Sequence, residues 1–168
     1  MAPRPDVTVA ADGAPELVWL DRVVEDASRN VAAGGGPFGA LVVRGDEIVA
    51  TGVNQVTRAL DPTAHAEVVA IRAACRALGD YRLAGCVLVS SCEPCPLCMA
   101  AAMWARLDRV VYAADRHDAA ASGFDDRTFY DVFSAPRKEW PLPVAQMLHA
   151  RRTAPFEAWR DHPGRVDY

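Results

Sequence analysis

Ser91-Cys92-Glu93-Pro94-Cys95-Pro96-Leu97-Cys98 is the stretch from which the rest of the chain can be interpreted. Cys95 and Cys98 follow a proline, a residue that is tolerated in the first turn of a helix. Side chains spaced i and i+3 lie on one helix face, so both sulfurs can reach a common point. The positive end of the helix dipole favours their thiolate forms. The stretch therefore predicts a pair of metal-binding thiolates at the start of a helix.

A third ligand is expected in the earlier triplet His65-Ala66-Glu67. One histidine with two cysteines suits Zn²⁺ better than Mg²⁺ or Ca²⁺, which prefer oxygen ligands. On a helix, residues i and i+2 point to different faces, so Glu67 is expected beside the metal rather than on it. The fourth tetrahedral position then stays open for a water that Glu67 can deprotonate. The alternative is a structural zinc site with Cys92 or His117 as the fourth ligand.

Composition limits the class of protein. The 168 residues suffice for one domain with a substantial core. The net charge of −4 argues against a nucleic-acid partner, because phosphate binding requires a basic face. No stretch approaches the ~18 apolar residues of a membrane span, and residues 1–14 lack the pattern of a secretory signal. Five cysteines fit metal binding in a reducing compartment, so we expect a cytoplasmic protein without a membrane partner.

Apolar periodicity predicts an alternation of helices and strands. Helices are expected over residues 16–33, 63–78, 94–105, 128–133 and 155–161. Strands are expected over residues 38–43, 48–54, 86–90, 109–114 and 144–149, the first two forming a hairpin around Arg44-Gly45-Asp46. Thr63 is the expected N-cap of the second helix, and Gly79 closes it. Strands that alternate with helices indicate an α/β protein built on βαβ units and a mixed sheet.

Three motifs now resemble a known superfamily. Asp61-Pro62-Thr63-Ala64-His65-Ala66-Glu67, Ser91–Cys98 and Arg109-Val110-Val111-Tyr112 are similar to the zinc deaminases of the cytidine deaminase-like superfamily. Gly35-Gly36-Pro37-Phe38-Gly39-Ala40, Ala120–Asp126 and the ending from Pro155 to Tyr168 resemble its small bacterial guanine deaminases. The resemblance implies a three-layer α/β/α fold with a central mixed five-stranded sheet. It also implies one deaminase domain over residues 16–168, after a disordered or loosely packed lead-in over residues 1–15.

The resemblance further implies a reaction. A zinc-bound hydroxide would attack the ring carbon, and Glu67 would pass the proton to the leaving amino group, so that guanine gives xanthine and ammonia. Guanosine, cytosine and ammeline stay open as alternative substrates of the same chemistry, and adenosine in tRNA is a further one. A zinc-binding module without enzymatic activity, which kept the fold for dimerisation or partner binding, is the alternative of another class.

Substrate contacts are implied residue by residue. Asn54 and the backbone around Ala66 would hydrogen-bond the purine ring, although Asn54 could be a plain turn residue at the end of a strand. Phe38 and Trp104 would pack against the flat base, and either could instead belong to the core. Asp126 would accept hydrogen bonds from N1 and the exocyclic amino edge of guanine, a donor pattern that adenine lacks. A bare surface turn is its alternative.

The end of the chain carries the last implication. In the resembled family, the C-terminal segment, here residues 136–168, is exchanged across a homodimer and closes the partner's site. Tyr168 would then act as a lid or in a proton relay, in its own or the partner's site. The proline-rich residues 135–143 would suit the hinge of such an exchange. The expected partners are therefore a small nucleobase and a second copy of the chain.

Overall fold

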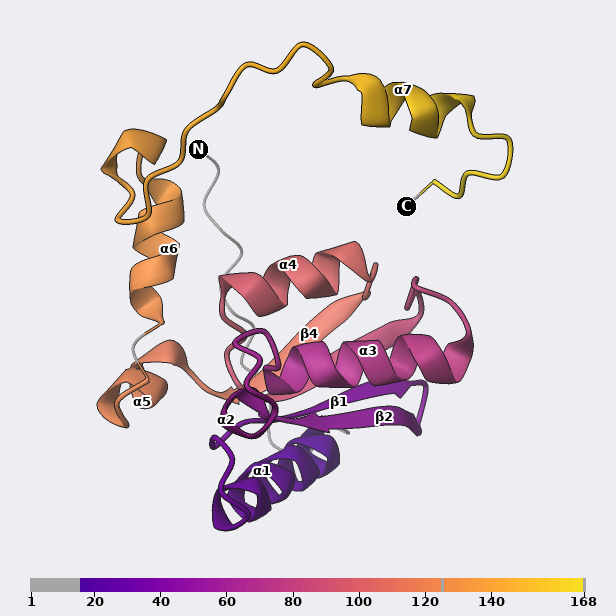
Figure 1. Cartoon of the computed structure of the whole chain (residues 1–168). Coiled ribbons are helices and arrows are strands. Elements are labelled where there is room, and N and C mark those ends of the chain that lie inside the picture. The colour runs from indigo at the N-terminus through magenta and orange to yellow at the C-terminus, as the bar shows by residue number, and fades with distance from the viewer. Residues whose placement is uncertain (1–15, 125, 168) are drawn as a thin grey trace, which may run out of the picture. The chain divides into compact units, whose positions relative to one another are not determined.

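The computed structural model describes residues 16–124 and 126–167 (Figure 1). The chain divides into two compact units, residues 1–127 and residues 128–168, which are treated separately below. The predicted lead-in of residues 1–15 and the predicted lid residue Tyr168 lie outside the described residues. Among the described residues, no helix is long and apolar enough to cross a membrane.

The first unit is built on a mixed sheet whose four strands run in the order β2-β1-β3-β4. These strands are β1 (Gly39–Arg44), β2 (Glu47–Val53), β3 (Cys86–Cys92) and β4 (Arg109–Ala114). β1 pairs antiparallel with both β2 and β3, whereas β3 and β4 are parallel. The predicted hairpin is confirmed, with Gly45 at a φ of +58° in the turn between β1 and β2. The four predicted strands of this part of the chain are therefore all present.

Helices cover both faces of this sheet, as Figure 1 shows. On one face, α1 (Glu16–Ala32) buries Val23 against alternate residues of β1 and β3. On the other face, the residues of opposite orientation, such as Val42 and Leu88, pack with α3 (Ala66–Leu78) and α4 (Pro96–Trp104). Because successive side chains of a strand point to opposite faces, β1 and β3 are buried on both sides. The expected three-layer α/β/α arrangement is confirmed.

Two glycines set how closely the helices approach the sheet. A Cβ on Gly39 would lie 2.6 Å from the Val23 carbonyl oxygen of α1. A Cβ on Gly52 would lie 2.3 Å from the Ala66 carbonyl oxygen, at the first residue of α3. Both neighbours are backbone atoms, which cannot rotate away. The start of α3 is therefore held directly against β2.

The helices that carry the metal-binding motifs begin later than predicted. Thr63 is not the N-cap of α3, because both its backbone N–H (2.8 Å) and its hydroxyl (2.7 Å) donate to the Asp61 carboxylate. His65 is the N-cap instead, and Cys95 is the N-cap of α4. Both residues have extended backbone conformations just before their helices. Gly79 ends α3 in the left-handed conformation, as predicted.

Two short helices of the first unit were not predicted, α2 (Val56–Ala59) and α5 (Arg116–Ala121). Asp115 caps α5, because its carboxylate accepts from the backbone N–H groups of His117 (2.7 Å) and Asp118 (2.9 Å). The Asp118 side chain accepts in return from the Asp115 N–H, completing a capping box. The periodicity of a four- or six-residue helix is too short to be recognised in sequence.

The second unit contains most of α6 (Arg127–Ser134), a 3₁₀ turn η1 (Arg137–Glu139) and α7 (Ala154–Asp161). The predicted helices over 128–133 and 155–161 are confirmed. The predicted strand over 144–149 is wrong, and with it the five-stranded sheet, since the described sheet has four strands. A strand needs a neighbour that satisfies its backbone groups, and this segment has none among the described residues. Its Met147 and Leu148 are more than four-fifths exposed.

Candidate zinc and nucleobase site

The first unit brings three metal-binding side chains together where α3 and α4 begin. The His65 Nδ1 lies 3.6 Å from the Cys95 Sγ and 3.5 Å from the Cys98 Sγ, and the two sulfurs are 3.7 Å apart. Ligands about 2.0–2.3 Å from a tetrahedral Zn²⁺ would be separated by roughly 3.5–3.8 Å. The donor atoms and their spacing therefore fit zinc, and the predicted ligand set is confirmed as a group positioned to bind a metal ion.

Neither candidate for a fourth protein ligand belongs to this group among the described residues. The Cys92 Sγ lies 3.6 Å from the Asp115 carbonyl oxygen, to which it donates. Burial raises the pKa of the Cys92 thiol to about 11, which opposes thiolate formation. The His117 Nδ1 lies 3.5 Å from a guanidinium nitrogen of Arg127. A closed structural zinc site thus lacks its fourth ligand in this part of the chain.

The two thiols are hydrogen-bonded to each other, and their pKa values are shifted in opposite directions. The pKa of Cys95 is lowered to about 4, chiefly by the hydrogen bond between the two cysteines and also by the neighbouring His65, while burial opposes both. The same hydrogen bond, together with burial, raises the pKa of Cys98. The pKa of His65 is raised chiefly by its hydrogen bond with Cys95. The surroundings thus favour one thiolate at Cys95, and a bound cation would favour loss of the proton from Cys98 as well.

Glu67 occupies the second position of α3 and lies beside this group. Its carboxyl lines the same cavity as His65 and Cys95, and only 6% of the residue is exposed. Burial is the main cause that raises its pKa above the usual range of a glutamate. A buried carboxyl with a raised pKa can both accept and release a proton near neutral pH. The expected position of Glu67, next to the metal ligands without joining them, agrees with the structure.

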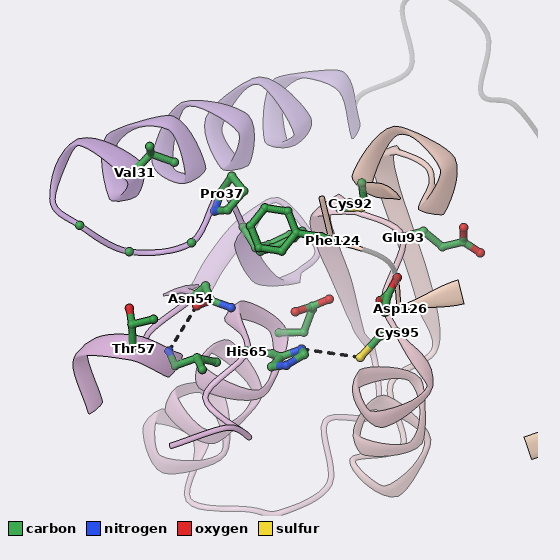
Figure 2. Close-up of a pocket in the computed structure, with 17 residues that line it drawn as sticks. Val31, Pro37, Asn54, Thr57, His65, Cys92, Glu93, Cys95, Phe124 and Asp126 are labelled. Atoms are coloured by element: carbon green, nitrogen blue, oxygen red, sulfur yellow. Dashed lines mark hydrogen bonds between the residues drawn. The ribbon is translucent and has the colours of Figure 1, made fainter. Parts of the chain in front are cut away.

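A cavity of about 670 Å³ borders these residues. Its volume is within the range that is usual for small-molecule sites. Its walls come from the end of α1, the glycine loop (residues 34–36) with the two residues after it, the residue after β2, α2, the start of α3, the end of β3 with the segment after it, and α5 with the segment after it. Figure 2 shows labelled side chains from these segments around one hollow. The lining is mainly apolar with a few polar groups, as is usual for sites that bind flat organic molecules.

Asn54 directly follows β2 and lines the cavity. Its Oδ1 accepts a hydrogen bond of 3.2 Å from the Val56 N–H, so it is indeed a turn residue. Its side-chain nitrogen points away from Val56 toward the hollow (Figure 2). The two readings of Asn54 are therefore compatible, because one side chain can shape the turn and still present a donor to a ligand.

An aromatic pair forms one wall of the cavity. Phe38 and Phe124 both line it, with ring centroids 5.1 Å apart and planes at 87°. Edge-to-face contact of this kind is favourable, and both rings border the space that a flat ligand would occupy. Phe124 was not predicted as a site residue, although it precedes Asp126 by only two positions. An aromatic residue so close to a candidate polar contact was the signal that could have identified it.

Asp126 lines the cavity from the segment that follows α5. Burial is the main cause that raises its pKa, with the negative charge of Cys95 as the second cause. Ala66 is fully buried at the start of α3, between the two functional side chains of its triplet. Trp104 lies at the end of α4, is 60% exposed and does not line the cavity. The structure therefore does not bring Trp104 to the site, and Trp104 is no core residue.

Glu93 is a second cavity residue that the sequence did not single out. Its carboxylate accepts from the Arg116 Nε at 2.9 Å and from the backbone N–H of the same residue at 3.1 Å. The other carboxylate oxygen pairs with the Arg116 Nη2. This bidentate pair ties the segment before Cys95 to the start of α5.

Comparisons with known proteins agree with this geometry. Residues 16–114 match the cytidine and deoxycytidylate deaminase zinc-binding region. The guanine deaminase of Bacillus subtilis (strain 168) is 48% identical over 151 residues, covering 89% of this chain and 97% of the relative. The tRNA-specific adenosine deaminase of Aquifex aeolicus (strain VF5) is 37% identical and covers 64% of this chain and 72% of the relative.

Solved structures give the same order of similarity. The X-ray structure of the Bacillus subtilis guanine deaminase has a TM-score of 0.88 and 47% identity, covering 90% of this chain and 98% of that one. A guanine deaminase from Nitrosomonas europaea has a TM-score of 0.63 and 34% identity, covering 70% and 68%. A tRNA deaminase structure has a TM-score of 0.60 and 32% identity, covering 78% and 98%.

Proposed function

Because this chain belongs to the cytidine and deoxycytidylate deaminase zinc-binding family, and within it to the guanine deaminases, we infer that it hydrolyses guanine to xanthine and ammonia. The observation that supports guanine as the substrate is the length of the chain over which the similarity to guanine deaminase extends. Similarity to guanine deaminase extends over 89% of the chain, well beyond residue 114, where the shared zinc-binding region ends. The part beyond it includes Phe124 and Asp126, which line the cavity.

The zinc site supplies the nucleophile. Held by His65, Cys95 and Cys98, zinc would acidify water and so provide a hydrolytic nucleophile at neutral pH. Glu67 accepts a proton from that water on a carboxylate oxygen and donates it to the exocyclic nitrogen, which leaves as ammonia. The buried position and raised pKa of Glu67 support this shuttle, because the same group must bind a proton and give it up within one turnover.

The cavity walls orient the base. Phe38 packs against the flat ring, while Asn54 and the backbone around Ala66 hydrogen-bond its edge. Asp126 accepts from N1 and the exocyclic amino group, which places its carboxylate opposite donors that guanine has and adenine lacks. Solved structures of one relative and of a mutant of it contain 2,6-diaminopurine, an aminopurine, and 8-azaguanine, a close analogue of guanine. These ligands support a purine as the substrate of this site.

A turnover panel tests the substrate. The purified zinc enzyme is incubated with guanine, guanosine, cytosine, adenine and ammeline, and ammonia release is followed for each. We expect guanine to give the highest kcat/KM. Negligible turnover of guanine beside good turnover of another compound would refute guanine as the substrate and leave the deaminase chemistry in place. Deamination of adenosine in tRNA is disfavoured by the net charge of −4. Binding of tRNA that survives moderate salt in a gel-shift experiment would contradict this view.

We also propose that the protein is a homodimer in which residues 136–168 are exchanged. The support is the apolar surface of the second unit, where Leu142, Met147 and Leu148 are each at least 74% exposed. Exposed apolar side chains in such number mark an interaction surface. Light scattering after size exclusion should give the mass of a dimer, and Met147→Lys with Leu148→Lys should give a monomer. A wild-type monomer at micromolar concentration would disprove the exchange.

Tyr168 and the location of the protein complete the proposal. As the last residue of the exchanged segment, Tyr168 would close a site or relay a proton, and Tyr168→Phe separates the two, because only a relay needs the hydroxyl.

Trp104 stays a proposed base contact only if the dimer brings it to the partner's site. A cytoplasmic location is supported by two metal-binding cysteines that must stay reduced.

A further inference from the structure

Asn30 is a buried polar residue that belongs to neither the metal site nor the expected substrate contacts. It lies in the last turn of α1 and is 4% exposed. Its Nδ2 donates to the Gly36 carbonyl at 2.8 Å and to the Asn54 carbonyl at 2.9 Å, while its Oδ1 accepts from an Arg58 guanidinium nitrogen at 3.1 Å. One amide thus joins the glycine loop, the residue after β2 and α2.

One of the three contacts of Asn30 is with the backbone of Asn54, which lines the cavity. The Asn54 N–H donates to the Phe38 carbonyl at 3.0 Å, and its Oδ1 accepts from Val56. Its carbonyl accepts from Asn30, so the residue is fixed on three sides. The glycine loop packs against the same side chain, because a Cβ on Gly36 would lie 3.0 Å from the Asn54 Cγ. The side-chain nitrogen of Asn54 is the group that faces the hollow (Figure 2).

We propose that Asn30 is a positioning residue that holds Asn54 and the glycine loop in the geometry required for deamination of the bound base. The inference rests on the proposed function, since it assigns Asn54 a contact with the substrate. A buried asparagine could merely satisfy polar groups of its own helix. The Asn30 Nδ2 instead donates to carbonyls 6 and 24 residues away, both in segments that line the cavity. These hydrogen bonds connect separate segments of the chain and do not serve the end of the helix.

The test is a double-mutant cycle. Asn30→Asp keeps the shape and the acceptor for Arg58 but replaces both donors by acceptors that repel the two carbonyls. Misplacing a substrate-positioning group by about 1 Å can cost up to ~100-fold in rate, so kcat/KM should fall roughly 10–100-fold. In the Asn54→Ala background the same substitution should cost less than about threefold, because residues that act through one another are not additive.

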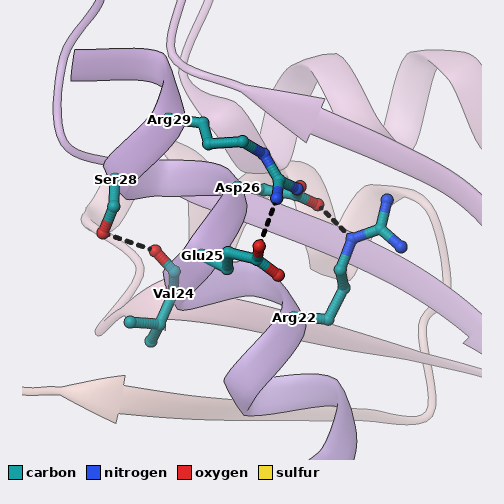
Figure 3. A network of polar contacts seen from close by, with 6 residues as sticks. All are labelled: Arg22, Val24, Glu25, Asp26, Ser28 and Arg29. Carbon is teal, nitrogen blue, oxygen red and sulfur yellow. Dashed lines mark hydrogen bonds and ion pairs between the residues drawn. The ribbon is translucent and has the colours of Figure 1, made fainter. Parts of the chain in front are cut away.

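Controls separate positioning from stability. Ser28 lies on the same helix as Asn30, and its hydroxyl donates to the Val24 carbonyl at 2.9 Å (Figure 3). We therefore expect wild-type kinetics for Ser28→Ala. Thermal unfolding of every variant gives the folded fraction used to correct kcat. Equal losses of corrected kcat/KM in both Asn54 backgrounds would show that Asn30 does not act through Asn54. Unchanged corrected kinetics with a lower Tm would reduce Asn30 to a structural residue.

A second variant applies if Asn30→Asp does not fold. Gly35→Ala leaves Asn30 intact, but its Cβ would lie 2.3 Å from the Asn30 Nδ2 and so would displace the amide from its partners. It should reproduce the loss in kcat/KM and the same dependence on Asn54. The cycle uses whichever base of the panel the wild type deaminates best, so a failure of guanine as substrate does not decide the role of Asn30. Full activity of Gly35→Ala would overturn the proposal.

Discussion

At the scale of single residues, Glu67 separates zinc binding from catalysis. Glu67→Ala leaves the three ligands His65, Cys95 and Cys98 in place, so the variant should still contain one zinc per chain. The variant lacks the proposed acceptor of the water proton, and positioned proton transfer contributes typically 10²–10⁴-fold. We expect kcat to fall by at least about a hundredfold, measured as ammonia release beside a metal analysis of the same sample.

The matched control for this prediction is a glutamate far from the cavity. Glu25 is exposed on α1 and pairs with Arg29 at the surface (Figure 3), so Glu25→Ala should keep wild-type kinetics. Activity of Glu67→Ala close to that of the wild type would contradict the mechanism. Loss of zinc together with activity would instead mean that Glu67 supports the metal site.

At the scale of elements, the contact between β2 and α3 positions the triplet His65-Ala66-Glu67. Gly52→Ala puts a Cβ 2.3 Å from the Ala66 carbonyl oxygen and 2.5 Å from the Ala70 nitrogen, so the helix must move away from the strand. Overpacking of this kind typically costs about 1–3 kcal/mol. We expect a lower Tm and weaker zinc binding, because His65 caps the displaced helix.

Thr51→Ala is the control for this prediction, since the side chain belongs to the same strand and is exposed. It should change the midpoint of denaturant unfolding little, because surface substitutions usually stay within about 0.5 kcal/mol. If Gly52→Ala bound zinc as tightly as the wild type, the packing of α3 on β2 would not be what positions the metal ligands.

The capping box of α5 gives a prediction with a defined pH dependence. Hydrogen bonds from the Asp118 and His117 N–H groups are the main causes that lower the pKa of Asp115. A lowered folded pKa means that the stabilisation is present above the unfolded pKa of about 3.9 and is lost as pH falls through the folded value. The Tm difference between wild type and Asp115→Ala should therefore be largest near neutral pH and shrink in acid. A difference independent of pH would exclude the charged cap.

At the scale of the whole molecule, the parts that sequence could predict are those with a local physical signal. Cys95 and Cys98 lie three positions apart in the chain. The hairpin around Gly45 and the end of α3 at Gly79 each depend on a single turn. Two of the misses depend on distant partners. Residues 144–149 could form a strand only beside a neighbouring strand, and Val144 is their one β-branched residue. Phe124 meets Phe38 across 86 residues of chain, a contact that one sequence does not encode visibly.

Removal of the metal tests how far the fold depends on its site. His65 caps α3, and Cys95 caps α4, so zinc would join two helices of one core. Binding that occurs only in the folded state stabilises it, by about 2.7 kcal/mol when free ligand is a hundredfold above Kd. Dialysis against a strong chelator should abolish ammonia release and lower the Tm, and one equivalent of Zn²⁺ should restore both. Mg²⁺ should restore neither, because the sulfur ligands do not suit it. Full activity of a chelated sample whose zinc content is shown to be zero would refute the zinc-dependent mechanism.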